Sequence, residues 1–358
     1  MLRALHISGF RAIRELDVDK LGQVNVLIGR AGCGKSSVLE GLAVAAFVLY
    51  GSEQPVSKGA LDMLKYVAAR HGASSSHYYA GLSIELGLIP AKRLSFNYVG
   101  SFSTSLTGMD GKSVRIDVAL HERECSVKRC WVEIEGEARE LGGLPARHYI
   151  SELEDMAINS LAGLVFIDGI FMRCVFDLPG PWEKFFTEGY DRRACEALTE
   201  VLGVEVEDMR TIPRGEGRFD VLVSVRSGER TQRLFLGDMA EGARGLLSVI
   251  LGAIYVGEKG TLLMEEPEMH LHPLGMVSLA DLIADISKRL GQQAFISTHS
   301  MEMADAISKA CEKRGAECRI IFLHRRPDGF VEARVLMNNQ YRELREMGLD
   351  LRTVPEIL

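Results

Sequence analysis

Residues 29–36 carry the types and spacing that phosphate binding requires. The segment reads Gly-Arg-Ala-Gly-Cys-Gly-Lys-Ser and fits the pattern G-x-x-x-x-G-K-[ST] at every fixed position. Glycines let successive backbone N–H groups curl around a phosphate, and a helix that follows adds partial positive charge. In such a loop Lys35 reaches the β- and γ-phosphates, and the Ser36 hydroxyl binds Mg²⁺. The predicted nucleotide-binding residues are Gly29, Arg30, Ala31, Gly32, Cys33, Gly34, Lys35, Ser36 and Ser37, and the alternative is a glycine-rich turn.

A second candidate group is the acidic pair Glu265 and Glu266, which ends the short apolar run that begins at Thr261. A phosphate-loop enzyme places at such a strand end one acid that holds Mg²⁺ and a neighbouring acid that activates water. We therefore predict Glu265 as a metal ligand and Glu266 as the general base. Asp is more common than Glu at the first position, and a solvated pair of carboxylates is the structural alternative.

A histidine follows at the end of another apolar run. His299 comes after Phe295-Ile296-Ser297-Thr298, so a strand would deliver its imidazole to the same sheet edge as the acidic pair. An imidazole there suits hydrogen bonding to the γ-phosphate or to the attacking water. We predict a catalytic role for His299 beside Lys35 and Glu266. His270 and His272 could indicate a metal, but the absence of an evident third ligand favours a turn.

The composition bounds the class of protein. The chain has 358 residues, 47% of them hydrophobic and 25% charged, and a net charge of −7. This charge argues against a uniformly basic nucleic-acid binder, although Lys128-Arg129 and Arg192-Arg193 could form a local basic face or a solvated one. The apolar stretch from Leu42 to Tyr50 is too short to cross a bilayer. With no signal sequence and seven scattered cysteines, we expect a cytoplasmic protein with reduced thiols and no membrane association.

The periodicity of apolar residues divides the chain into two kinds of region. Both ends alternate strands and helices, whereas residues 79–140 alternate with a period of two, as in an antiparallel meander. Residues 145–210 are predicted to be mainly helical, and a hairpin is predicted around Ser227-Gly228. The strands expected near the ends of the chain are Leu2–Ile7, Arg14–Val18, Val24–Ile28, Thr261–Glu265, Ala294–Ser297 and Arg319–Leu323. The helices expected there are Lys35–Tyr50, Ala60–Arg70, Leu246–Tyr255, Leu274–Leu290, Met301–Arg314 and Tyr341–Leu351.

This pattern predicts an α/β fold in which one core is split by an insertion. We expect a discontinuous phosphate-loop ATPase core at residues 1–70 and 236–358, with a mixed sheet. The inserted lobe, residues 71–235, would contribute antiparallel β-structure followed by helices.

The combined motifs resemble a known superfamily. The chain is similar to ABC-type ATPase heads of the SMC/RecF/OLD group, specifically to stand-alone AAA-family ATPases related to the ATPase half of OLD nucleases. The resemblance rests on Ile7-Ser8-Gly9-Phe10-Arg11-Ala12-Ile13, the phosphate loop, Glu265-Glu266-Pro267-Glu268, Leu271-His272-Pro273 and Thr298-His299-Ser300. It covers both ends of the chain, and the middle matches only in position and β character.

The resemblance implies a site shared between two copies. In that family two heads pack head to tail around ATP, and a signature segment of one head completes the site of the other. The matching segment here is Leu236 to Leu247, with Ala240, Glu241 and Gly242 as the candidate signature residues. Three departures predict slow hydrolysis. Ala240 replaces a common serine, Ala31 replaces a common asparagine, and no glutamine between Gln54 and Gln232 can supply the usual glutamine-loop contact to Mg²⁺.

The function implied by the resemblance is Mg²⁺-dependent ATP binding and slow hydrolysis by a homodimer that gates a partner, in DNA transactions or phage defence. The partner could be a separate effector or nuclease subunit. The acidic cluster of a nuclease domain is not expected within the residues that follow His299. The rival interpretation is a nucleotide-gated dimerisation module with little turnover. Direct DNA binding is a third possibility, which would require a basic stripe and a steep salt dependence.

Overall fold

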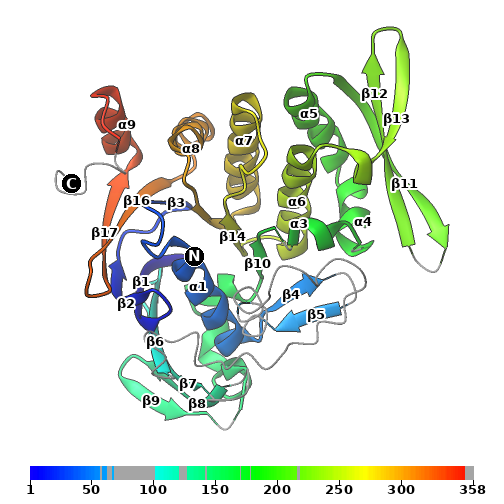
Figure 1. Ribbon diagram of the computed structural model, residues 1–358. Coiled ribbons are helices and arrows are strands. Elements are labelled where there is room, and N and C mark those ends of the chain that lie inside the picture. The colour runs from blue at the N-terminus through cyan, green and yellow to red at the C-terminus, as the bar shows by residue number, and fades with distance from the viewer. Residues whose placement is uncertain are drawn as a thin grey trace.

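A computed structural model describes residues 1–56, 59–62, 67, 101–120, 127–141, 143–169, 171–177, 179–215 and 218–350. Its centre is a twelve-stranded mixed sheet with helices on both sides (Figure 1). The order of the strands across this sheet is β10-β14-β15-β3-β16-β17-β2-β1-β6-β7-β8-β9. The first five strands are parallel to one another, and antiparallel pairing dominates the rest.

The parallel half holds the strands that precede the predicted site residues. Its strands are β10 (Leu164–Ile167), β14 (Thr261–Glu265), β15 (Gln293–Ser297), β3 (Val24–Ile28) and β16 (Cys318–Arg325). All residues of β3 and β15 are buried, as expected for parallel strands covered on both faces. Because the strands are parallel, their carboxyl ends meet at one edge of the sheet.

The antiparallel half begins at β17, which pairs with β16 in the antiparallel sense and with β2 in the parallel sense. Its strands are β17 (Phe330–Met337), β2 (Ile13–Val18), β1 (Leu2–Phe10), β6 (Ser101–Gly108), β7 (Ser113–Leu120), β8 (Val127–Ile134) and β9 (Glu137–Glu140). Along β6 and β7 every second residue is buried. This alternation leaves one polar face open and packs the other into the core.

Helices cover the sheet on two sides. Helix α1 (Lys35–Tyr50) lies on one side, while α6 (Glu241–Val256), α7 (Pro273–Leu290), α8 (Met301–Arg314) and α9 (Asn338–Glu346) form a row on the other (Figure 1). The side chains of β3 divide accordingly between two cores. Val24, Val26 and Ile28 belong to the core with α6–α8, and Leu27 belongs to the core with α1.

The middle of the chain supplies the remaining elements. Their bounds are α3 (Phe171–Cys174), α4 (Pro179–Thr187), α5 (Tyr190–Leu202), β11 (Glu205–Gly215), β12 (Arg218–Ser227), β13 (Arg230–Phe235), β4 (Glu53–Val56) and β5 (Gly59–Asp62). Short 3₁₀ helices are η3 (Ala146–His148), η4 (Ser151–Glu154), η5 (Ala157–Leu161), η6 (Val175–Asp177) and η7 (Leu236–Asp238). Strands β11–β13 form a separate sheet that projects beyond α5 (Figure 1).

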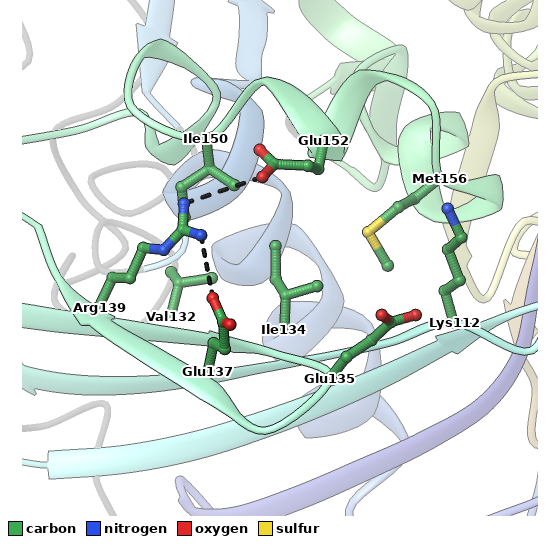
Figure 2. A pocket seen from close by; sticks show the side chains of 9 residues that line it. All are labelled: Lys112, Val132, Ile134, Glu135, Glu137, Arg139, Ile150, Glu152 and Met156. Atoms are coloured by element: carbon green, nitrogen blue, oxygen red, sulfur yellow. Dashed lines mark hydrogen bonds and ion pairs between the residues drawn. The ribbon is translucent and has the colours of Figure 1, made fainter.

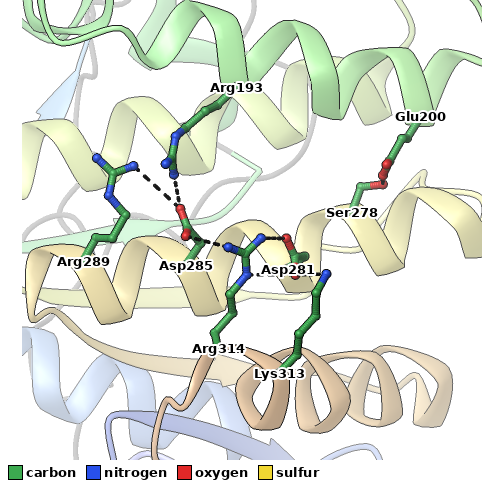
Figure 3. Close-up of polar contacts among 8 residues, drawn as sticks. All are labelled: Arg193, Glu200, Ser278, Asp281, Asp285, Arg289, Lys313 and Arg314. Atoms are coloured by element: carbon green, nitrogen blue, oxygen red, sulfur yellow. Dashed lines mark hydrogen bonds and ion pairs between the residues drawn. The ribbon is translucent and has the colours of Figure 1, made fainter.

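A network of charged side chains fastens α5 to α7 and α8 (Figure 3). Asp285 on α7 pairs with Arg193 on α5 and, at 3.0 Å, with Arg314 on α8. Asp281 binds the same Arg314 and also Lys313, at 3.2 Å. These shared carboxylates join α5 to α7 and α8, which lie far from it in the sequence.

The structure confirms the α/β class, the mixed sheet, the hairpin of β12 and β13, and the limits of α1, β14 and α8. Two expectations are wrong. Ala60–Asp62 lie in strand β5 rather than a helix, and the region predicted as mainly helical also contains β10 and β11. The strands expected around Leu82–Leu86 and Leu94–Tyr98 lie outside the described residues.

The division into a core and an inserted lobe stays a prediction. Strand β10 lies within the range 71–235, yet it pairs with β14 of the predicted core. Strand β6, from the same range, pairs with β1. The two parts therefore share one sheet, so any boundary between them passes through hydrogen-bonded strands.

Candidate functional site

The phosphate-loop motif lies between the carboxyl end of β3 and the N-terminus of α1. Gly34 is the N-cap of α1 with a φ of 104°, and no side chain caps the first turn. The N–H groups that open this helix therefore face the loop, where they can donate to an anion. Gly29 has a φ of 148°, and a Cβ there would lie 2.4 Å from the carbonyl oxygen of Leu323. The loop thus requires glycine for close packing as well as for backbone conformation.

Lys35 is folded back onto its own loop and is only 5% exposed. Its Nζ donates hydrogen bonds to the carbonyl oxygens of Gly29 at 3.0 Å and Arg30 at 3.3 Å. Burial lowers the pKa of Lys35, and the neighbouring Cys33 and Glu266 oppose this shift. A phosphate would replace two neutral acceptors with charged ones and so strengthen the hydrogen bonding of this ammonium group.

His299 connects Lys35 to Glu266. Its Nδ1 lies 3.5 Å from Lys35 Nζ, and its Nε2 lies 3.3 Å from Glu266 Oε1. A donor on one side and an acceptor on the other fit the tautomer with the proton on Nε2. Glu266 has a φ of 45°, a strained value for this residue type. The fold therefore brings together the three residues predicted to be catalytic.

The two predicted metal ligands lie at the same sheet edge. Ser36 is half-buried in the first turn of α1, and Glu265 is half-buried as the last residue of β14. Strand β15 separates β14 from β3. A hydroxyl and a carboxylate are hard oxygen donors of the kind that Mg²⁺ takes together with phosphate oxygens and water. The residues present fit Mg²⁺ and a nucleotide, although the assignment of individual ligands stays a prediction.

Two family models match the chain. An "AAA domain" matches residues 4–80, which include the phosphate loop, and an "AAA ATPase domain" matches residues 205–304, which include both acids and His299. The chain is 30% identical over 115 residues to "Uncharacterized protein MJECL11" of Methanocaldococcus jannaschii, covering 32% of this chain and 99% of that protein. It is also 24% identical over 334 residues to an OLD nuclease of Thermus scotoductus, covering 85% of this chain and 60% of the nuclease.

Several solved structures of ATPase heads are similar to this chain. The SMC head bound to the C-terminal winged-helix domain of ScpA superposes with a TM-score of 0.57 at 17% identity, over 96% of this chain and 99% of that chain. The SMC head of Pyrococcus furiosus superposes with a TM-score of 0.56 at 13% identity, over 97% of this chain and 98% of that chain. This chain has the fold of an SMC ATPase head, and two of its segments match AAA ATPase models. The head spans about 60% of the OLD nuclease that it matches.

The predicted signature segment of the ATPase head lies at the N-terminus of α6. Ala240 is the exposed N-cap, Glu241 is exposed, and Gly242 is buried. A Cβ on Gly242 would lie 2.8 Å from the carbonyl oxygen of His270, so this helix end packs tightly on the loop after β14. A carboxylate oxygen of Glu241 lies 3.1 Å from His270 Nε2. His272 caps α7 through its Nδ1, and among the described residues neither His270 nor His272 belongs to a group of side chains close enough to share a metal.

Two arginines proposed for a basic face of the head have acidic partners. Arg193 pairs with Asp285, and Arg129 lies 3.9 Å from Glu140. Burial raises the pKa of Cys33 in the phosphate loop, which disfavours the reactive thiolate. Direct DNA binding through these arginines therefore gains no support, and Cys33 is not placed to act as a reactive thiolate.

Cavities occur both at the phosphate loop and elsewhere in the head. A cavity of about 360 Å³ lies between the loop and the end of β16, where Arg30, Arg325 and Arg326 line it. A second, of about 280 Å³, lies against β8 and β9 and has an apolar floor that includes Val132 and Ile134 (Figure 2). The second is lined by none of the predicted ATP-site residues. Ion pairs of Arg139 with Glu137 and Glu152 cross its rim.

Sequence reasoning missed two acidic residues near the site. Asp168 follows β10, whose register with β14 brings it to the same edge as Glu265, and it is 4% exposed. One of its oxygens accepts a hydrogen bond from the backbone N–H of Phe171 at 2.9 Å. Glu268 was part of the recognised motif but had no role. The four apolar residues before Asp168 could not be distinguished from a buried helical turn by their pattern, and only the fold shows the burial of Glu268.

Other features of the described residues do not bear on the site. The cluster of His6, Glu15 and Asp17 is the group among these residues whose ligand atoms are close enough to share a metal. It lies on the open face of strands β1 and β2 and already contains a 2.7 Å contact between His6 and Asp17. None of the described helices is long and apolar enough to cross a membrane.

Proposed function

We propose that this ATPase head binds ATP with Mg²⁺ and hydrolyses it slowly in a head-to-tail homodimer that gates a partner. The observation that carries the proposal is the line of contacts from Lys35 through His299 to Glu266 at the phosphate loop. Such a line connects a phosphate-binding cation with a carboxylate that can accept a proton from water. Each of the three side chains has a role in hydrolysis.

In this proposal different residues of the site bind the phosphates, bind Mg²⁺ and activate water. Lys35 exchanges the loop carbonyl oxygens for phosphate oxygens, and the free N–H groups of α1 hold the same anion. Mg²⁺ beside Ser36 and Glu265 would neutralise charge on the phosphates. Glu266 takes a proton from the attacking water, and His299 orients the water or the γ-phosphate by hydrogen bonding.

The second copy would supply the signature segment. The N-cap of α6 is exposed at Ala240 and carries no side-chain cap, so its helix N-terminus is available to an anion on another chain. The absence of a hydroxyl at Ala240 removes one hydrogen bond to the γ-phosphate, which supports slow turnover. The partner would act in DNA transactions or phage defence, by analogy with an SMC head bound to ScpA and with an OLD nuclease.

A nucleotide-gated dimerisation module is the second candidate, because the departures at Ala31 and Ala240 predict slow hydrolysis while Lys35 and the phosphate loop remain. Phosphate release by the wild type and by Glu266→Gln distinguishes the two. An ATPase loses release in Glu266→Gln while retaining ATP binding, because the amide cannot accept the proton. Equal, background release by both proteins would exclude the enzyme in favour of the module.

A further inference from the structure

Glu268 is a buried carboxyl in the loop that carries Glu266. It is 7% exposed, and its Oε1 accepts a hydrogen bond from the Thr298 hydroxyl. Its Oε2 is buried and has no hydrogen-bond partner among the described residues. Burying a carboxyl with one oxygen unsatisfied costs stability, and an apolar side chain of similar size would avoid that cost. A specific role for the group would account for its presence.

The contacts of Glu268 lead to the turn that carries His299. Thr298 Oγ1 donates to Glu268 and accepts a hydrogen bond from the backbone N–H of Ser300 at 2.9 Å. The residues on both sides of His299 are therefore tied to one carboxyl. Ser300 connects this turn to α8, because its side chain caps the helix by accepting a hydrogen bond from the N–H of Met303 at 3.1 Å.

The same carboxyl is two residues from Glu266, whose side chain meets the His299 imidazole at 3.3 Å. We propose that Glu268 is a positioning residue, which braces the loop of Glu266 against the turn of His299 through Thr298. This inference rests on the proposed function of Glu266 and His299. The brace acts on the geometry of the imidazole and leaves the phosphate loop unchanged.

The chain offers two matched pairs of substitutions that test the brace. Glu268→Gln keeps the shape and the acceptor oxygen for Thr298, whereas Glu268→Met removes the acceptor at similar size. Thr298→Ser keeps the hydroxyl, whereas Thr298→Val removes it. If the two residues act through one hydrogen bond, the two disruptive changes are equivalent and their double variant is no worse than either alone.

The experiment measures ATP turnover, ATP affinity and the His299 ring of the nucleotide-free full chain, by imidazole ¹H–¹⁵N NMR assigned with His299→Gln. We expect Glu268→Met and Thr298→Val to lower kcat about tenfold, with KM and affinity within about twofold and the His299 signals shifted. Glu268→Gln and Thr298→Ser should resemble the wild type. Where Glu268→Met does not fold, as judged by thermal unfolding, the threonine pair carries the test.

Other outcomes overturn the proposal. Unchanged His299 signals in folded Glu268→Met or Thr298→Val exclude a brace, as does a loss in Glu268→Gln as large as in Glu268→Met. Turnover that is equal in the wild type and Glu266→Gln would instead refute the proposed ATPase. In that case the ring signals still decide whether Glu268 positions the imidazole.

Discussion

The parallel and antiparallel halves of the sheet have similar numbers of strands but different tasks. In the parallel half, strands β3, β14 and β15 end next to Lys35, Glu266 and His299. The antiparallel half presents an open polar face with ion pairs such as Arg115–Asp117, at 3.1 Å. The carboxyl ends of parallel strands meet at one edge of the sheet, so residues that are far apart in the sequence can lie together there. Along an antiparallel strand the polar side chains point to one face at every second residue, so they are spread over that face. We therefore expect substitutions in the two halves to affect ATP chemistry very differently.

The largest expected effect is that of Lys35→Ala. The variant lacks the buried ammonium group next to the free N–H groups of α1, so ATP turnover should fall about 1000-fold. Nucleotide binding, measured by the ATP-dependent rise in unfolding temperature, should also be lost. The matched cation in the other half is Arg115. Turnover in Arg115→Ala should equal that of the wild type, and a loss comparable to that of Lys35→Ala would remove the contrast between the halves.

His299→Gln should lower kcat roughly 100-fold, because the amide cannot reproduce both contacts of the imidazole. Affinity for ATP should change little, since the loop and Lys35 remain. Single-turnover kinetics separate these two quantities. His6→Gln, on the antiparallel face, is the control and should leave kcat unchanged. A weaker affinity with normal kcat in His299→Gln would assign this histidine to binding instead of catalysis.

Substitutions at the N-cap residue Ala240 should either lower or raise ATP turnover. Aspartate is a favourable N-cap residue, so Ala240→Asp should not destabilise α6, but its charge would repel a γ-phosphate held by the partner. Turnover should fall about tenfold, while Ala240→Ser should raise it by adding a hydroxyl donor. Steady-state phosphate release reports both. If both variants hydrolyse ATP at the wild-type rate, this helix end does not belong to the site.

The pH dependence of stability gives a smaller effect. Burial raises the pKa of Glu268 above its ordinary 4.5, the Thr298 hydrogen bond opposes the shift, and the charge of Glu266 adds to it. The neutral carboxyl therefore stabilises the fold fully below the pKa of the unfolded chain, and this contribution is lost as pH rises through the folded pKa. Urea unfolding from pH 4 to 8 should show this decline in the wild type and a flatter profile in Glu268→Gln. The exposed Glu343→Gln should retain the wild-type profile.

The smallest effect concerns the ion-pair network of Figure 3. Asp285→Asn removes the charge that Arg193 and Arg314 share, and both arginines are partly exposed. The free energy of unfolding should fall by about 1 kcal/mol, with kcat unchanged. Chemical denaturation measures the first and phosphate release the second. A large loss of kcat would mean that the network transmits geometry to the site.

The sequence predicted the centre of the parallel half well because β3, β14 and β15 each end in a motif. The phosphate loop, Glu265-Glu266 and His299 each mark the carboxyl end of a short apolar run, and the runs were too hydrophobic to be exposed. Strand β10 was missed because four apolar residues cannot be distinguished from a buried helical turn by periodicity. The contacts of Glu268 depend on two loops that meet only in the fold, so no local pattern could reveal them.

The central claim is that each ATP site combines the phosphate loop of one chain with the signature segment of another. Mixing two impaired variants, Lys35→Ala and Ala240→Asp, tests this claim directly. A mixed dimer would contain one site with both defects and one with none, so an equimolar mixture should recover about a quarter of wild-type turnover. If the signature segment served its own chain, every site would carry one defect. A mixture whose turnover is no higher than the average of the two variants measured separately, although mixed dimers form, would contradict the account.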